Sequence, residues 1–205
     1  MPSPDTSRLR RIRLTLWGLV SLTALVVIAL YYADAGQPDT SNSDVEHAAL
    51  GGPFTLVDAG GKPFSSSRLN GKPYAIFFGF TRCGDVCPTT LSRLVQLRKQ
   101  AGEESAFNIV FVTIDPQNDG PREVGQYAQL FNSPIIGLTG SPEQIAAVKK
   151  QFGIYAEPEP HAAMGKQFTH TGSVLLFGRD GRLTGTLSGS DSNGEALDKL
   201  RKLVA

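Results

Sequence analysis

The sequence lacks an excess of charge of either sign. It carries 20 basic and 19 acidic side chains over 205 residues, and the formal net charge is +1. Lys and Arg do not cluster beyond the first fifty residues, so the composition does not indicate a nucleic-acid surface. Internal repeats and low-complexity domains are also missing. With only two cysteines and three histidines, thiol or imidazole chemistry is limited to a few positions.

The N-terminus does contain a long apolar run. Residues 1–13 are rich in arginine, and residues 14–32 follow without a charged side chain. At about 1.5 Å per residue the run reaches roughly 28 Å, close to the ~30 Å hydrocarbon core of a bilayer. Arginines before the run and acidic residues after it orient it by the positive-inside rule. We therefore expect a cytoplasmic tail at 1–13 and a single transmembrane helix at 14–32.

A cleaved signal peptide is the alternative, because Ala33–Ala35 resembles a cleavage site. In either case the rest of the chain faces an oxidising compartment. We expect a protein of the inner (cytoplasmic) membrane, with its domain in the periplasm or an equivalent exported compartment. Residues 33–52 are polar and predict a flexible linker, and residues 53–205 are enough for one globular domain.

Apolar periodicity along this domain predicts alternating strands and helices. We expect a hairpin at 53–67, buried strands at 74–80 and 107–115, a short strand or turn at 134–140, helices at 89–101, 121–131, 141–153 and 193–204, and a hairpin at 172–189. This order predicts an α/β sandwich. The first long buried strand ends just before both cysteines, at the carboxyl edge where sites lie in such sheets.

The two cysteines, Cys83 and Cys87, lie in the stretch FFGFTRCGDVCPTTL with three residues between them. Pro88 suits the first turn of a helix, which would place Cys87 near a helix N-terminus and lower the pKa of its thiol. A thiolate suits both disulfide exchange and metal binding. A purely structural disulfide is the third reading, although a bridge over so short a loop would stabilise the fold little.

A third ligand could come from His170, just before the last hairpin. In a sandwich of this order the turn at His170 packs beside the cysteine loop. Two thiolates and one imidazole favour copper, as Cu(I) or Cu(II), whereas zinc would normally require a fourth ligand. A surface histidine without a ligand role is the alternative.

The cysteine stretch, the downstream VTIDPQND and the late histidine resemble the Sco/SenC family of copper chaperones. The resemblance covers residues 53–205 and implies a thioredoxin-like sandwich with a central mixed sheet. It also implies one copper ion bound by Cys83, Cys87 and His170. Asp115 and Asp119 match the acidic motif of the family and would lie around the metal rather than bind it directly, although turn formation alone also explains them.

Two features depart from the family pattern or add to it. Thr169 precedes the histidine where relatives often carry an acidic residue. The Pro-rich segment before it offers His161 and Met164 as further copper ligands, although incidental loop residues are the simpler reading.

By resemblance, we expect a chaperone that delivers copper to the binuclear centre of cytochrome c oxidase subunit II or of a related receiving protein. It could also, or instead, reduce the cysteines of that receiving protein. Delivery would proceed by ligand exchange, without bond-making catalysis. Copper binding needs reduced thiols, which predicts a thiol reductase as a partner and allows another periplasmic copper chaperone as the source.

The alternatives are an exported thiol–disulfide oxidoreductase or a redox sensor on the same fold. Against the oxidoreductase, the spacing is longer than Cys-x-x-Cys, and no proline precedes the last hairpin. A purely structural or adhesive exported domain is a further alternative.

Overall fold

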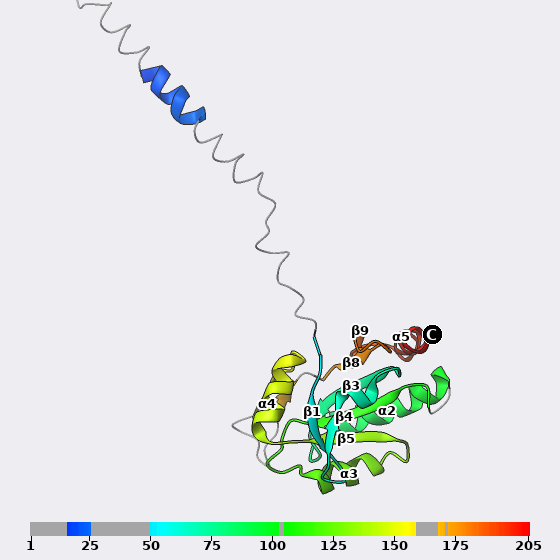
Figure 1. Ribbon diagram of the computed structural model, residues 1–205. Coiled ribbons are helices and arrows are strands. Elements are labelled where there is room, and N and C mark those ends of the chain that lie inside the picture. The colour runs from blue at the N-terminus through cyan, green and yellow to red at the C-terminus, as the bar shows by residue number, and fades with distance from the viewer. Residues whose placement is uncertain (1–15, 26–49, 103–104, 159–167, 171) are drawn as a thin grey trace, which may run out of the picture. The chain divides into compact units, whose positions relative to one another are not determined.

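The computed structural model describes residues 16–25, 50–102, 105–158, 168–170 and 172–205 (Figure 1). The chain divides into two units, residues 1–48 and 49–205. In the first unit, residues 16–25 are helical and exposed, and the rest of the expected span at 14–32 lies outside the described residues. Within the described ranges, no helix has the length and hydropathy needed to cross a bilayer.

The second unit is built on a seven-stranded mixed sheet in the order β2-β1-β5-β4-β3-β8-β9. Strand β3 runs parallel to β4, and β4 runs parallel to β5, while the other pairs are antiparallel. The strands are β1 (Thr55–Asp58), β2 (Pro63–Ser65), β3 (Tyr74–Gly79), β4 (Asn108–Thr113), β5 (Ile135–Thr139), β8 (Val174–Phe177) and β9 (Leu183–Leu187). The expected α/β architecture with a central mixed sheet is therefore confirmed.

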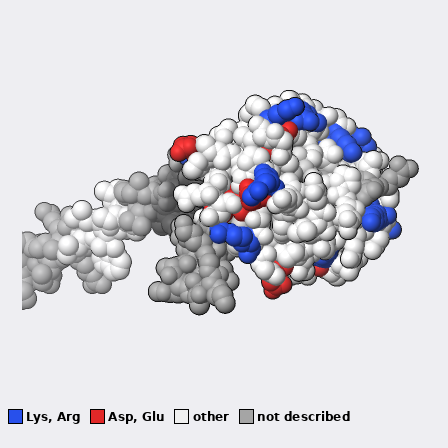
Figure 2. All heavy atoms as spheres, turned by 90° about the horizontal axis from the view of Figure 1, so that it is seen from below, with Lys and Arg blue, Asp and Glu red and all other residues white. Residues whose placement is uncertain are grey.

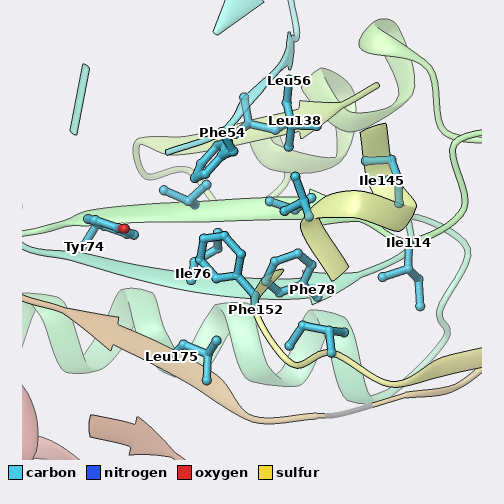
Figure 3. Packing of buried hydrophobic residues seen from close by; sticks show 14 of the residues in the cluster. Phe54, Leu56, Tyr74, Ile76, Phe78, Ile114, Leu138, Ile145, Phe152 and Leu175 are labelled. Carbon is cyan, nitrogen blue, oxygen red and sulfur yellow. The ribbon is translucent and has the colours of Figure 1, made fainter. Parts of the chain in front are cut away.

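Among the described residues of this unit, four α-helices and one short 3-10 helix accompany the sheet. They are η1 (Ser66–Leu69), α2 (Val86–Ala101), α3 (Pro121–Gln129), α4 (Pro142–Gln151) and α5 (Asn193–Val204). One apolar cluster joins α2, α3 and α5 to one face of the sheet. The other joins α4 and the β1–β2 region to the opposite face, as Figure 3 shows in part. Strands β3 and β4 contribute to both clusters, which explains their continuous apolar sequence.

Local signals in the sequence account for several element ends. Ser141 caps α4 with a capping box, and Gly153 follows that helix with φ of 64°. The hairpin of β8 and β9 turns at Asp180–Gly181, where φ of Gly181 is 74°. The final helix, α5, has the predicted bounds.

A second, two-stranded sheet is formed from the two ends of the Pro-rich segment that leads to His170. Strand β6 (Ala156–Pro158) pairs antiparallel with β7 (Phe168–His170), and Ala156 is opposite His170. The segment between the strands, with His161 and Met164, lies outside the described residues. Because β6 directly follows α4 and Gly153, the helix end and this strand pair are continuous parts of the domain.

The chain enters the second unit through contacts with the end of α4. The Gly51 N–H donates to the carbonyl of Gln151 at 3.0 Å, and the Gln151 side chain donates to the carbonyls of Gly51 and Pro53, each at 3.1 Å. Gly51 has φ of 101° and lies against the ring of Phe177, so no larger residue fits there. Residues just before β1 are therefore part of the folded unit.

Charged side chains on this unit stand as separate small groups. Figure 2 shows Lys and Arg at several isolated points of one face, with acidic residues between them. Some form exposed pairs, such as Arg122 with Glu123 and Arg201 with Asp198. Exposed pairs of this kind contribute little to stability.

Candidate functional site

The two cysteines lie at the carboxyl end of β3, at the entrance to α2. The Cys83 N–H donates to the carbonyl of Phe80 at 3.2 Å, which folds the loop back on the strand end. Cys87 is in the first turn of α2, and its N–H donates to Cys83 Sγ at 3.4 Å. The helix N-terminus therefore directs one of its free amides at the sulfur of the other cysteine.

The two thiols differ in exposure. Cys87 is completely buried, whereas Cys83 is partly exposed. Gly79 permits this burial, because a Cβ there would lie 2.8 Å from Cys87 Sγ. Burial, followed by the hydrogen bond with Cys83, raises the pKa of the Cys87 thiol. The predicted lowering of the Cys87 pKa by the helix N-terminus is therefore wrong for the metal-free thiol, because desolvation outweighs the helix dipole.

Asp119 ties the start of the cysteine loop to the sheet. Its buried carboxylate accepts hydrogen bonds from the Thr81 N–H at 2.9 Å, from Thr81 Oγ1 at 2.6 Å and from Thr113 Oγ1 at 2.7 Å. The Asp119 carbonyl accepts a further bond from Thr139 Oγ1 at 2.7 Å. Asp119 therefore connects the loop with the end of β4 through its side chain and with the end of β5 through its carbonyl.

Asp115 holds the next residue of the same loop. Its buried carboxylate accepts from the Arg82 guanidinium at 2.5 Å, and its two oxygens accept from Asn118 Nδ2 at 2.9 and 3.0 Å. The Asp115 N–H donates to Thr113 Oγ1 at 3.0 Å. Both aspartates thus lie beside the cysteine loop, and both hold it through hydrogen bonds within the protein. Their expected place around a bound metal stays a prediction.

The region of His170 also lies next to the cysteine helix. Gly172, two residues further on, lies near Val86, since a Cβ added at Gly172 would be 4.0 Å from Val86 Cγ1. The backbone of His170 is in β7, but its side chain is outside the part of the chain described. Within that part, no group of three His, Cys, Asp or Glu side chains gathers as a metal site. The ligand role of His170 therefore remains a prediction.

Sequence reasoning missed two threonines that support the cysteine loop and one buried tyrosine near it. Thr81 and Thr113 follow or end buried strands and bind Asp119, and Tyr127 on α3 belongs to the same apolar cluster as Cys87. A polar residue at the end of a parallel strand was the available signal for the threonines. Tyr127 gave no signal beyond its helical spacing from Val124.

This arrangement defines a class of protein. A partly exposed thiol in a loop and a buried thiol in the first turn of the next helix, four positions apart at the carboxyl end of a central strand, form the dithiol of a thioredoxin-like domain. Such a pair can close to a disulfide or bind a soft metal ion.

Comparison with known proteins places the chain within this class. Residues 42–205 match the model of the SCO1/SenC family. The chain therefore belongs to the SCO1/SenC family. The expected resemblance is confirmed on this ground, and the fold is the thioredoxin-like fold of Sco structures.

Three relatives illustrate the match. The copper-bound ScoI of Bradyrhizobium japonicum is 35% identical with a TM-score of 0.68, over 76% of this chain and 99% of that one. BsSco, described as having a disulfide switch and as a member of a family of cytochrome c oxidase assembly proteins, is 26% identical with a TM-score of 0.57, over 75% and 92%. Mitochondrial SCO2 of Saccharomyces cerevisiae is 31% identical over 160 residues, which are 76% of this chain and 53% of the yeast protein. The chain spans about two thirds or less of the length of the curated relatives that it matches.

Proposed function

We propose that this protein binds one copper ion through Cys83 and Cys87, with His170 as the third ligand. The observation that carries the proposal is the dithiol at the carboxyl end of β3, where Cys87 N–H lies 3.4 Å from Cys83 Sγ. Copper-bound relatives of the same fold support the choice of metal. Two sulfurs suit Cu(I), and an added imidazole suits Cu(II) as well.

The surroundings of the pair favour a fixed binding geometry. Hydrogen bonds from Thr81 and Arg82 to buried aspartates hold the loop before Cys83, while α2 holds Cys87. Gly172 lies near Val86, so the chain that follows His170 approaches the helix turn that holds Cys87. These contacts favour a defined relative position of the two cysteines, as a metal site requires.

The receiving partner that we propose is subunit II of cytochrome c oxidase or a related copper protein, as the Sco family description of BsSco suggests. Transfer requires ligand exchange alone. Acceptor thiolates and imidazoles replace the protein ligands one at a time, beginning at the partly exposed Cys83.

We further propose that residues 14–32 anchor the chain in the inner membrane, with the N-terminus cytoplasmic and the domain exported. In that compartment a thiol reductase keeps the pair reduced, and another periplasmic copper chaperone can supply the metal.

The unequal exposure of the cysteines favours a second candidate function, reduction of a client disulfide. The Cys83 thiolate would attack a client sulfur and release one client thiol. The Cys87 sulfur would then displace the second, leaving a Cys83–Cys87 disulfide and a reduced client after a two-electron transfer. The disulfide switch described for BsSco is consistent with such a cycle.

Copper titration of the reduced full-length protein tests the proposal. We expect one equivalent of tightly bound copper, lost in Cys83→Ser and Cys87→Ser and strongly weakened in His170→Ala. His161→Ala is the matched control, because it removes a histidine of the same region that is not a proposed ligand. Oxidation of the pair should also abolish binding, since copper requires thiolates.

The outcomes separate the two candidates. Equal copper affinity of the reduced and oxidised protein would refute copper binding by the pair. Absence of copper binding together with stoichiometric reduction of a model disulfide would assign the protein to the thiol–disulfide oxidoreductases.

A further inference from the structure

The strand that carries His170 is held to the domain through its neighbour. Among the described strands, β7 pairs with β6 alone, and Ala156 of β6 lies opposite His170 in the register. A histidine on a two-stranded sheet can bind a metal together with the cysteine loop only when that sheet is fixed relative to the loop. The contacts that fix β6 therefore also fix the backbone of His170.

Strand β6 follows the end of α4 after a tight turn. The Ile154 N–H donates to the Lys149 carbonyl at 2.8 Å, and the Ile154 side chain is buried. Ala156, two residues further on, packs against the apolar cluster that Figure 3 shows in part, and so does Cys83. The cross-strand partner of His170 and the partly exposed cysteine therefore share one cluster.

One charged side chain adds a direct tie between α4 and β6. The partly buried Lys149 donates from Nζ to the Ala156 carbonyl at 3.4 Å, and within the described ranges it forms no ion pair. A hydrogen bond from a charged donor is stronger than a neutral one, although this bond is long. The charge of Lys149 thus acts on the backbone of β6.

Lys149 differs in this respect from its neighbour. Lys150 lies in the same last turn of α4, where a cation interacts favourably with the helix dipole, but its side chain is exposed. The dipole alone is served by either lysine. The contact with β6 belongs to Lys149.

We propose that Lys149 is a positioning residue of the copper site, which holds β6 and thereby keeps the backbone of His170 in the place that metal binding requires. The inference rests on the proposed role of His170 as a copper ligand. Ordering a loose segment costs conformational entropy, so a ligand on a poorly held strand binds more weakly. The apparent affinity falls with the fraction of molecules in which the strand is in place.

The two oxidation states of copper should respond differently. An imidazole suits Cu(II), whereas two thiolates already suit Cu(I). Loss of the tie at Lys149 should therefore weaken Cu(II) binding and leave Cu(I) binding almost unchanged. The same selectivity is expected of His170→Ala.

The test is Lys149→Met in the full-length protein, which keeps an unbranched apolar stem and removes the ammonium. We expect Cu(II) affinity to fall about three- to tenfold, below the roughly 10- to 100-fold typical of a residue bonded directly to a metal ligand, because Lys149 acts through the strand pair. In the metal-free protein, the amides of residues 154–156 and 168–170 should exchange hydrogen faster, since this segment opens more often.

Two variants serve as controls for Lys149→Met. Lys150→Met removes the adjacent charge of α4 without touching β6 and should change neither Cu(II) affinity nor hydrogen exchange. Lys149→Arg retains a cationic donor and should restore most of the Cu(II) affinity. In a His170→Ala background, Lys149→Met should have no further effect, because residues that act through one another are not additive.

The outcomes separate this inference from the proposed function. If His170→Ala weakens Cu(II) binding but Lys149→Met binds it as Lys150→Met does, the role of Lys149 is refuted and the proposed function stands. An equal loss on Lys149→Met with and without His170 would also refute the inference, because the lysine would then act by another route. If His170→Ala binds Cu(II) as the wild type does, or the wild type binds no copper, the proposed ligand set and the inference fail together.

Discussion

Replacing Asp119 should remove hydrogen bonds that support the cysteine loop while leaving both cysteines in place. The Asp119 carboxylate is fully buried and accepts three hydrogen bonds, two from Thr81 and one from Thr113. Hydrogen bonds to a charged group contribute about 1.5–3 kcal/mol each, and removal of the acceptor leaves buried donors unsatisfied. We therefore expect Asp119→Ala to lower the free energy of unfolding by about 3–5 kcal/mol, a large share of the ~5–15 kcal/mol of a typical domain.

Asp119→Asn should be milder. The amide keeps one acceptor oxygen and the size of the side chain, but it loses the charge and presents an NH2 group to a donor. We expect a loss of about 2 kcal/mol. Asp198→Ala is the control, because the Asp198 side chain is 70% exposed and its pair with Arg201 lies on the surface. Its effect should stay within about 0.5 kcal/mol.

The assay is urea unfolding followed by far-UV circular dichroism. Tryptophan fluorescence would not report on this domain, because the single tryptophan is Trp17, in the first unit. The midpoint should fall with the m value unchanged. A loss below about 1 kcal/mol for Asp119→Ala, or one no larger than that of Asp198→Ala, would refute the reasoning.

Two further predictions concern the residues at the two ends of β3, Gly79 beside Cys87 and Tyr74 at the start of the strand. Gly79→Ala should lower the free energy of unfolding by about 1–3 kcal/mol, because the new methyl group overlaps Cys87 Sγ, and should speed alkylation of the Cys87 thiol. An unchanged free energy of unfolding together with an unchanged rate of Cys87 alkylation would contradict the close approach of Gly79 to Cys87 Sγ. Burial raises the pKa of Tyr74 from 10.0 to about 12. The neutral phenol therefore stabilises the fold fully below pH 10, and this contribution, about 2 kcal/mol, is lost as pH rises toward 12. Unfolding curves of Tyr74→Phe should show a correspondingly weaker loss over that range, and parallel pH profiles of the two proteins would contradict it.

Much of the fold was predictable because its signals are local. Continuous apolar runs marked β3 and β4, which are covered on both faces, and capping at Ser141 and the turn at Asp180–Gly181 marked element ends. The pairing of β6 with β7 was not predictable in this way. It joins two segments on either side of the stretch around His161, which lies outside the described residues, and Pro158 argues against a strand.

In the candidate site, too, features with a local sequence signal were predictable and features that depend on distant residues were not. Cys83 and Cys87 were predictable from their spacing and their position after a buried strand. The pKa of Cys87 was not, since the helix start was visible in the sequence but the burial of the sulfur against Gly79 was not. The hydrogen bonds of Asp119 to Thr81 also escaped prediction, because they join residues 38 positions apart.

The attachment of Gly51 and Pro53 to Gln151 has a mechanical consequence. Tension applied along the N-terminal segment reaches the second unit first at the end of α4, through three hydrogen bonds, and only then at β1. These three hydrogen bonds involve neither cysteine. A pull on the segment before Gly51 is therefore resisted first at a helix end away from the thiol pair.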